Sequence, residues 1–171
     1  IGRESWEPDH LEIRILQSDA HILGAHAEAH ADPTVNLDSM GKFAAGDHVV
    51  MVFMPSCGAC RPCREGRPAL CEPGAAANGK GMLDTGAIRL SGEGGPIHHH
   101  LGVSAFAEYA VVSRHSLVRV DPGLPFVEAA LFGCAVLTGV GAVMNTAAVG
   151  AGSAVVVLGL GGIGLSSVLG A

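Results

Sequence analysis

The chain has few positive charges and no segment in which they gather. Lys and Arg total 10 among 171 residues, against 16 Asp and Glu, which gives a formal net charge of −6 at pH 7. Proteins that bind nucleic acid usually carry a basic patch, whereas the basic residues here are scattered pairs such as Arg61 and Arg64. The sequence therefore predicts that nucleic acid is not a partner.

The start of the chain lacks the features of a secretory leader. It begins at Ile1 and has no basic region followed by an apolar region. The cysteine count is also odd: there are five, and four of them fall between positions 57 and 71. This clustering favours a metal site in a reducing compartment over a disulfide framework. We therefore expect a cytoplasmic protein, and a first residue other than Met indicates a fragment of a longer chain.

Residues 129–171 contain no Asp, Glu, Lys, Arg or His. An uncharged stretch of this length is first compared with a transmembrane span, and a membrane-anchored metal protein is one interpretation. Polar and glycine-rich breaks at 145–146 and 150–153 precede a β-branched run at 154–158. A buried helix followed by a buried parallel strand fits this pattern better, because strands covered on both faces are continuously apolar. We therefore predict no membrane association.

The first two-thirds of the chain is predicted to be mainly β. Alternating or β-branched apolar patterns, the second of them after a Gly-Asp turn, predict strands within residues 11–16, 42–54, 106–112 and 117–120. No periodicity is found in residues 17–40. A long helix is predicted to begin at Phe126, with Glu128 in its first turn. Residues 55–97 hold five of the nine prolines, so this segment needs something other than long helices or strands to hold it together.

The four clustered cysteines supply that restraint. Their spacing is C-x2-C-x2-C-x7-C, formed by Cys57, Cys60, Cys63 and Cys71. Four thiolates at about 2.3 Å from a tetrahedral Zn²⁺ leave no open position, which is typical of a structural site. An iron–sulfur cluster is the alternative, but the fourth cysteine comes four residues later than in the bacterial ferredoxin pattern and is followed by Glu72 before Pro73. Zinc is therefore the predicted ion.

A glycine-rich turn follows the predicted strand at 154–158. Residues 159–164 form the pattern G-x-G-x-x-G, and residues 165–171 can begin a helix. In this context Gly159 suits a tight turn, Gly161 lets a pyrophosphate approach the backbone, and Gly164 lets the helix pack closely on the strand. The helix N-terminus would present free N–H groups to the phosphates. The turn therefore predicts a dinucleotide site; a glycine-rich loop or a membrane helix contact is the alternative interpretation of the motif.

In their order along the chain, the cysteine cluster, AFAEYAVV, EAALFGCAVLTGVGAV and VVVLGLGGIG resemble the zinc-containing medium-chain alcohol dehydrogenases, especially the bacterial branch near class III. The resemblance extends from about Phe43 to Ala171. It implies a mainly β GroES-like barrel with a structural zinc lobe, followed by the truncated start of an α/β Rossmann domain. The implied boundaries are 1–125 for the GroES-like catalytic domain, with the zinc lobe at 55–97, 126–150 for a linking helix, and 151–171 for the first β-turn-α unit.

The resemblance also implies roles for individual residues. Cys57, Cys60, Cys63 and Cys71 match the structural zinc ligands, and Cys134 matches the third protein ligand of a catalytic zinc. Thr138 matches the threonine that contacts the nicotinamide. The pyrophosphate turn is matched by Gly159, Gly161, Gly162 and Gly164. The implied reaction is hydride transfer between a small primary alcohol or aldehyde and NAD or NADP, in a full-length protein that forms a homo-oligomer.

The N-terminal forty residues depart from the family pattern. Leu16 stands where the first catalytic-zinc cysteine is expected, and no cysteine precedes Cys57. His26 is the nearest candidate for the second ligand and Ser18 for the proton-relaying hydroxyl, but neither has the family's surrounding motif. We therefore interpret residues 1–40 as either strongly diverged or corrupted, for example by a shifted reading frame. We expect zinc binding without turnover, and a non-catalytic zinc-stabilised binding module is the alternative function.

Overall fold

The computed structural model describes residues 10–15, 26–30, 43, 46–107 and 109–171. Seven strands are described: β1 (His10–Ile15), β2 (His26–His30), β3 (His48–Met51), β4 (Leu90–Gly92), β5 (Gly95–Ile97), β6 (Tyr109–Ser113) and β7 (Leu117–Arg119). The helices include α1 (Arg61–Arg64), α2 (Glu72–Gly79), α3 (Phe126–Leu131), α4 (Leu137–Gly141) and α5 (Gly162–Gly170). Two 3-10 helices, η2 (Pro68–Leu70) and η3 (Arg114–Ser116), and two π-helical segments, η4 (Phe132–Val136) and η5 (Ala142–Thr146), complete them.

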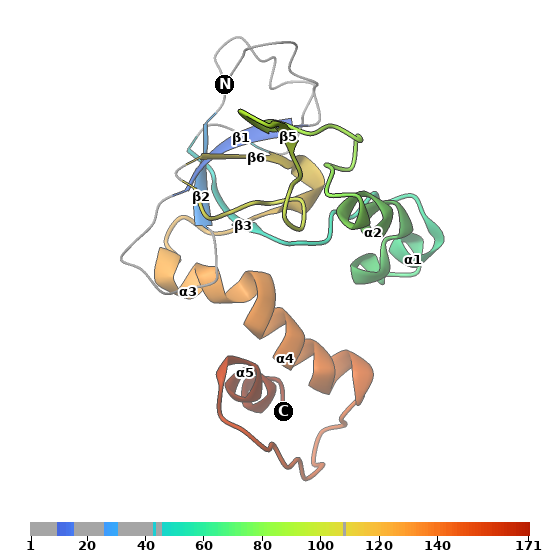
Figure 1. The fold of residues 1–171 in the computed structure, drawn as a ribbon. Helices are drawn as coiled ribbons and strands as arrows, with labels where there is room; N and C mark the ends of the chain where they lie inside the picture. The colour runs from blue at the N-terminus through green and yellow to red at the C-terminus, as the bar shows by residue number, and fades with distance from the viewer. Residues whose placement is uncertain (1–9, 16–25, 31–42, 44–45, 108) are drawn as a thin grey trace.

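Five antiparallel strands form a sheet in the order β6-β1-β2-β3-β7. Its edge strands, β6 and β7, are joined by only the three residues of η3. A flat sheet of this width would separate its edges by about 19 Å, because neighbouring strands lie about 4.8 Å apart. A 3-10 connection of this length spans about 8 Å at roughly 2 Å per residue. The sheet therefore curls on itself as a barrel (Figure 1).

The core lies inside this barrel. Its described members are Phe43, Val49, Met51, Ala110, Val112 and Leu117. Val49 and Met51 share one face of β3, as the two-residue period of a strand requires. Val50 points the other way and is nevertheless buried, because the helical segment at Gly133 packs on that outer face: a Cβ built on Gly133 would lie 3.3 Å from Val50 Cγ1. The start of this strand is set by Gly46, whose φ of 89° confirms the predicted turn.

A single helical segment, Phe126–Thr146, leaves the barrel and leads to α5 (Figure 1). Two π-helical stretches interrupt it. The segment is long and apolar enough to cross a membrane by length and composition, although core helices of soluble proteins meet the same criterion. Its N-terminus is fixed by a stack between Phe126 and His48 of β3, with ring centroids 4.4 Å apart.

The predicted strands within 11–16, 42–54, 106–112 and 117–120 are confirmed as β1, β3, β6 and β7. Residues 17–40, in which no periodicity is found, contain β2, which pairs with both β1 and β3. The predicted buried helix is mostly exposed. The predicted buried strand at 154–158 was also wrong: within the described residues it has no pairing partner, and Val156 and Leu158 are 84 % and 94 % exposed.

Candidate metal centre

Short helices with prolines in their first turns alternate with the four cysteines. Pro62, Pro68 and Pro73 occupy the first two positions of α1, η2 and α2, where a missing N–H costs no hydrogen bond. Cys60 precedes α1, Cys63 lies within it, and Cys71 lies between η2 and α2. Cys57 comes just before Gly58, whose φ of 72° turns the chain toward α1. This alternation of tight turns and short helices brings the thiols together.

The four sulfur atoms all lie within 4.8 Å of one another. In a tetrahedral site with Zn–S distances of about 2.3 Å, the sulfurs are about 3.8 Å apart, so a small contraction would complete the coordination sphere. Cys71 is fully buried and the other three cysteines are half-buried. The predicted convergence is therefore confirmed. Within the described part of the chain, this is the one group of three or more Cys, His, Asp or Glu side chains close enough to hold an ion.

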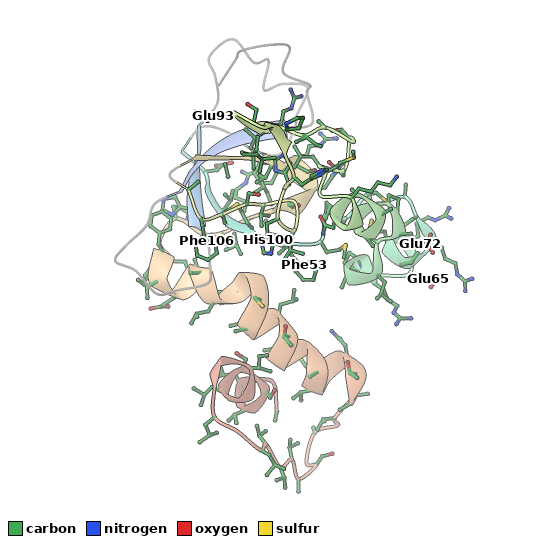
Figure 2. The ribbon with its side chains drawn as sticks, in the orientation of Figure 1. Phe53, Glu65, Glu72, Glu93, His100 and Phe106 are labelled. Atoms are coloured by element: carbon green, nitrogen blue, oxygen red, sulfur yellow. The ribbon has the colours of Figure 1, made fainter. Side chains whose placement is uncertain are left out.

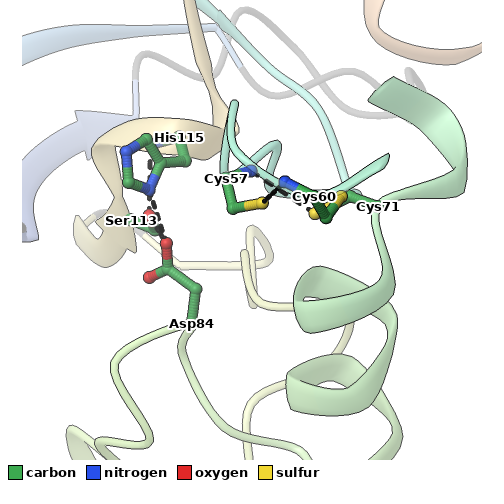
Figure 3. Close-up of polar contacts among 6 residues, drawn as sticks. All are labelled: Cys57, Cys60, Cys71, Asp84, Ser113 and His115. Atoms are coloured by element: carbon green, nitrogen blue, oxygen red, sulfur yellow. Dashed lines mark hydrogen bonds and ion pairs between the residues drawn. The ribbon is translucent and has the colours of Figure 1, made fainter. Parts of the chain in front are cut away.

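Backbone amides already solvate part of the sulfur cluster (Figure 3). The Cys57 N–H donates to Cys71 Sγ at 3.3 Å, and the Cys60 N–H donates to Cys57 Sγ at 3.3 Å. Hydrogen bonds from the Cys60 and Ala59 backbones lower the pKa of Cys57 to about 6. Burial, followed by the contact with the Cys60 thiol, raises the pKa of Cys63 to about 12. Without a metal, Cys57 therefore loses its proton readily, whereas Cys63 keeps its proton.

These opposite shifts predict how zinc affinity depends on pH. At neutral pH Cys57 is already deprotonated, whereas Cys63 must lose its proton to bind a metal. We expect affinity to fall as pH is lowered from 9 to 6, and to fall more steeply below about pH 6, where Cys57 takes up its proton. Competition with a chelator of known affinity across this range measures it. An affinity independent of pH would contradict the prediction.

The cysteine lobe, residues 55–97, is held against the barrel by α2. A Cβ on Gly74 would overlap the Pro55 carbonyl oxygen, so only glycine allows α2 to lie this close to the chain leaving β3. Asn78 Nδ2 donates to the Phe53 carbonyl at 2.7 Å. The part of the lobe with α1 and α2 projects from one side of the barrel (Figure 1, Figure 2). Its attachment thus includes a close approach of α2 to the Pro55 backbone and a hydrogen bond from Asn78.

A second polar cluster links this lobe to the barrel and was missed by the sequence analysis. Asp84 Oδ2 accepts hydrogen bonds from Ser113 Oγ at 2.8 Å and His115 Nδ1 at 2.6 Å (Figure 3). The arrangement is not that of a nucleophilic triad, because the hydroxyl donates to the carboxylate and not to the imidazole. The Asp84 contacts join residues 29 and 31 positions apart, so no spacing signal in the sequence could have found them.

Cys134 and Thr138 lie on the 126–146 helix, away from the four-cysteine group. Both side chains are exposed, and their separation of four residues places them one helical turn apart on the same face. The described residues place no ligand cluster around Cys134. Leu16 and Ser18 lie outside the described residues, as does the side chain of His26, whose backbone begins β2.

The predicted glycine turn, residues 159–164, has open space beside Gly159 and Gly161. Gly159 has a φ of 100°, a conformation that favours glycine, and Gly161 caps the N-terminus of α5. A Cβ on either residue, built in place, meets no described atom within 4 Å. On Gly164, in contrast, a Cβ would overlap the Gly159 carbonyl oxygen. Gly162, the first residue of α5, faces Ala135 of the 126–146 helix, with 3.4 Å between its Cβ position and Ala135 Cβ.

Comparison with protein families gives a direct match to this fold. The model of the alcohol dehydrogenase GroES-like domain matches residues 28–122, more than half of the chain. The chain belongs to the zinc-containing medium-chain alcohol dehydrogenase family. The matched range contains the four converging cysteines and most of the barrel strands.

Relatives and solved structures agree with this family. S-(hydroxymethyl)glutathione dehydrogenase of Escherichia coli O1:K1 / APEC is 44 % identical over 126 residues, which cover 74 % of this chain and 34 % of that protein. A solved alcohol dehydrogenase zinc-binding domain protein from Burkholderia ambifaria superposes with a TM-score of 0.76 at 28 % identity, covering 95 % of this chain and 48 % of that one. The chain thus spans about a third of the length of its curated relatives.

Benzyl alcohol dehydrogenase from Acinetobacter calcoaceticus has the same fold. Its structure superposes with a TM-score of 0.72 at 24 % identity, covering 98 % of this chain and 49 % of that one. The predicted GroES-like domain with a zinc-type cysteine cluster is therefore confirmed as the architecture of the matched region.

Proposed function

We propose that this chain carries the structural zinc site and the first part of the nucleotide site of an NAD- or NADP-dependent alcohol dehydrogenase. The observation that carries the proposal is the convergence of four sulfurs within 4.8 Å in a chain of this family. The reaction proposed for the whole protein is hydride transfer between a primary alcohol or aldehyde and NAD(P). A curated relative is named for S-(hydroxymethyl)glutathione, which carries on sulfur the same –CH2OH group as a primary alcohol, and this supports the proposed substrate class.

Four residues are proposed as the structural zinc ligands: Cys57, Cys60, Cys63 and Cys71. Their donor set suits zinc, since four thiolates favour tetrahedral zinc or iron–sulfur sites, and the enclosed geometry leaves no position for substrate. Only four residues of 55–97 are buried, namely Pro55, Cys71, Gly74 and Leu83. A lobe with so small a core depends on its metal, because free energy of metal binding becomes free energy of folding.

The hydride-transfer site is proposed on the 126–146 helix and the glycine turn. Cys134 is the proposed ligand of a catalytic zinc and Thr138 the proposed nicotinamide contact; their shared exposed face supports this pairing. The pyrophosphate is assigned to Gly159, Gly161, Gly162 and Gly164, supported by the open side of the turn at the start of α5. When bound, zinc supplies a Lewis acid to an alkoxide, and nicotinamide supplies the hydride acceptor.

The proposed domain organisation follows from these assignments. Residues 1–125 form the GroES-like domain, 126–150 the linking helix, and 151–171 the first β-turn-α unit of a Rossmann domain. The contact of Gly133 with β3 and the packing of α5 on α4 support a linking role for the helix over a membrane span. Five free cysteines support a cytoplasmic location, where thiols stay reduced. A homo-oligomer is proposed for the full-length protein.

We expect the 171-residue chain to bind zinc without turning over substrate. Leu16 replaces the first catalytic thiolate, so the catalytic site lacks a ligand that the structural site does not need. After dialysis, elemental analysis should find about one zinc per chain, as a closed four-thiolate site requires. The protein should be colourless, and NAD(P)H oxidation with an aldehyde should stay at the level of the buffer.

Other outcomes discriminate between the interpretations. Two tightly held zinc ions with measurable aldehyde reduction would contradict the inactivity and show a complete catalytic site. A brown protein that absorbs at about 400 nm would show that the cysteines hold an iron–sulfur cluster and not zinc. A further test uses a chain that carries Leu16→Cys and the family's restored upstream motifs. If this chain binds one zinc, does not turn over substrate and does not bind NAD(H), the non-catalytic binding module is favoured.

A further inference from the structure

The cluster of Asp84, Ser113 and His115 joins the middle of the cysteine lobe to the barrel. Asp84 lies in the turn that follows α2, next to the fully buried Leu83. Ser113 ends β6, and His115 lies in η3. The His115 N–H also donates to Ser113 Oγ at 3.1 Å, which closes a triangle of hydrogen bonds. One carboxylate oxygen therefore ties the loop after α2 to the connection between β6 and β7.

The backbone of His115 extends this link to the first cysteine. Its carbonyl oxygen accepts the Ser56 N–H at 3.2 Å, and Ser56 immediately precedes Cys57. The Ser116 carbonyl similarly accepts the Val52 N–H at 2.8 Å. The segment that delivers Cys57 from β3 thus runs along η3 and is held by it. A displacement of His115 would move the backbone on which Cys57 is mounted.

The contacts form a closed ring around the metal centre. Cys71 immediately precedes α2, α2 leads to Asp84, and Asp84 bonds His115. The His115 carbonyl accepts the Ser56 N–H, and Ser56 is followed by Cys57. The Cys57 N–H donates to Cys71 Sγ at 3.3 Å, which closes the ring. Figure 3 shows the two polar groups side by side. Two cysteines separated by 14 positions are thus fixed relative to each other by a route that does not pass through the metal.

We propose that Asp84, Ser113 and His115 are positioning residues for the four-cysteine site, forming a latch that fixes Cys57 relative to Cys71 and slows release of zinc. This rests on the proposed structural zinc. The latch acts on the rate at which the ligand shell opens, because release requires the Cys57 segment and the start of α2 to separate. The small buried core of the lobe leaves few other contacts to resist this motion.

Zinc transfer to excess 4-(2-pyridylazo)resorcinol under native conditions tests the latch. Wild type, Asp84→Ala, His115→Ala and the double variant are compared. Removing an outer contact of a metal site typically costs 10- to 100-fold in affinity, so we expect release about tenfold faster in each single variant. The double variant should release zinc no faster than either single variant, since both changes open the same ring.

Matched variants separate positioning from loss of overall stability. Ser113→Thr keeps the hydroxyl and should retain slow release, whereas Ser113→Ala should not. Arg119→Ala removes an ion pair with Asp47 at 3.4 Å elsewhere on the barrel and should leave the release rate unchanged. Amide hydrogen exchange at Ser56 in the zinc-loaded chain should accelerate in Asp84→Ala but not in Arg119→Ala. Asp84→Asn, which preserves shape, replaces Asp84→Ala if the latter fails to fold.

The outcomes distinguish the latch from the site that it serves. Release at the wild-type rate in both single variants, with one zinc bound, would overturn the latch and leave the zinc site standing. Equal acceleration by Arg119→Ala would assign the effect to general stability and also overturn it. A wild-type chain that holds no zinc would overturn the proposed function and the latch together.

Discussion

Replacing Cys71 by serine is expected to abolish tight zinc binding and to unfold the lobe of residues 55–97. Cys71 is the fully buried member of the four cysteines, and its sulfur accepts the Cys57 N–H at 3.3 Å. Structural zinc contributes about 10–16 kcal/mol of apparent binding free energy in small zinc domains, comparable with the about 5–15 kcal/mol that stabilises a whole protein. Loss of one thiolate therefore removes the main restraint on a lobe with little core. Elemental analysis and limited proteolysis measure both effects.

Cys134→Ser is the matched control for this substitution. Cys134 is exposed on the π-helical segment η4 and lies outside the four-sulfur group. The same chemical change should leave the zinc content and the protease resistance of the lobe unaltered. If Cys71→Ser kept one zinc per chain and the wild-type cleavage pattern, the four cysteines would not be the site that holds the lobe together.

The cysteine site was predictable because its members are close in sequence. Gaps of two and seven residues, with glycine and proline between them, leave few ways for the chain to run, and convergence on one point is among them. The Asp84–Ser113–His115 latch is the opposite case. It depends on β6 and η3 lying beside the turn after α2, which only the assembled barrel brings about.

The strands show the same distinction between local and distant causes. β1 and β3 have the alternation or β-branched run that defines a strand in isolation. β2, with the sequence HAEAH, alternates, but its apolar positions hold only alanine and it has no β-branched residue; it is a strand because β1 and β3 flank it on both sides. The apolar run at 154–158 gives the reverse error. Its composition predicts a covered strand, but composition does not supply the neighbouring strand to which it must bond.

The last large effect concerns the contact that docks α5 on α4. A Cβ on Gly139 would lie 2.5 Å from Ser166 Cβ and 2.8 Å from the Ser167 amide nitrogen. Ser167 Oγ also donates to the Gly139 carbonyl at 3.3 Å, which shows how closely the helices approach. Gly139→Ala should therefore push α5 away and lower the free energy of unfolding by about 1–3 kcal/mol, the usual cost of overpacking.

Gly141→Ala provides the comparison within the same helix. There the added Cβ would have Asn145 Nδ2 as its nearest neighbour, at 3.8 Å, which is ordinary contact. Because alanine favours a helix over glycine by about 0.8–1.0 kcal/mol, this substitution should stabilise the chain. Urea unfolding and amide exchange of α5 measure the two variants, and equal effects would show that the Gly139 contact does not hold α5. If Gly139→Ala destabilises the chain and Gly141→Ala stabilises it, the Gly139 contact does hold α5. The position of the glycine turn at residues 159–164 then depends on the packing of α5 against α4.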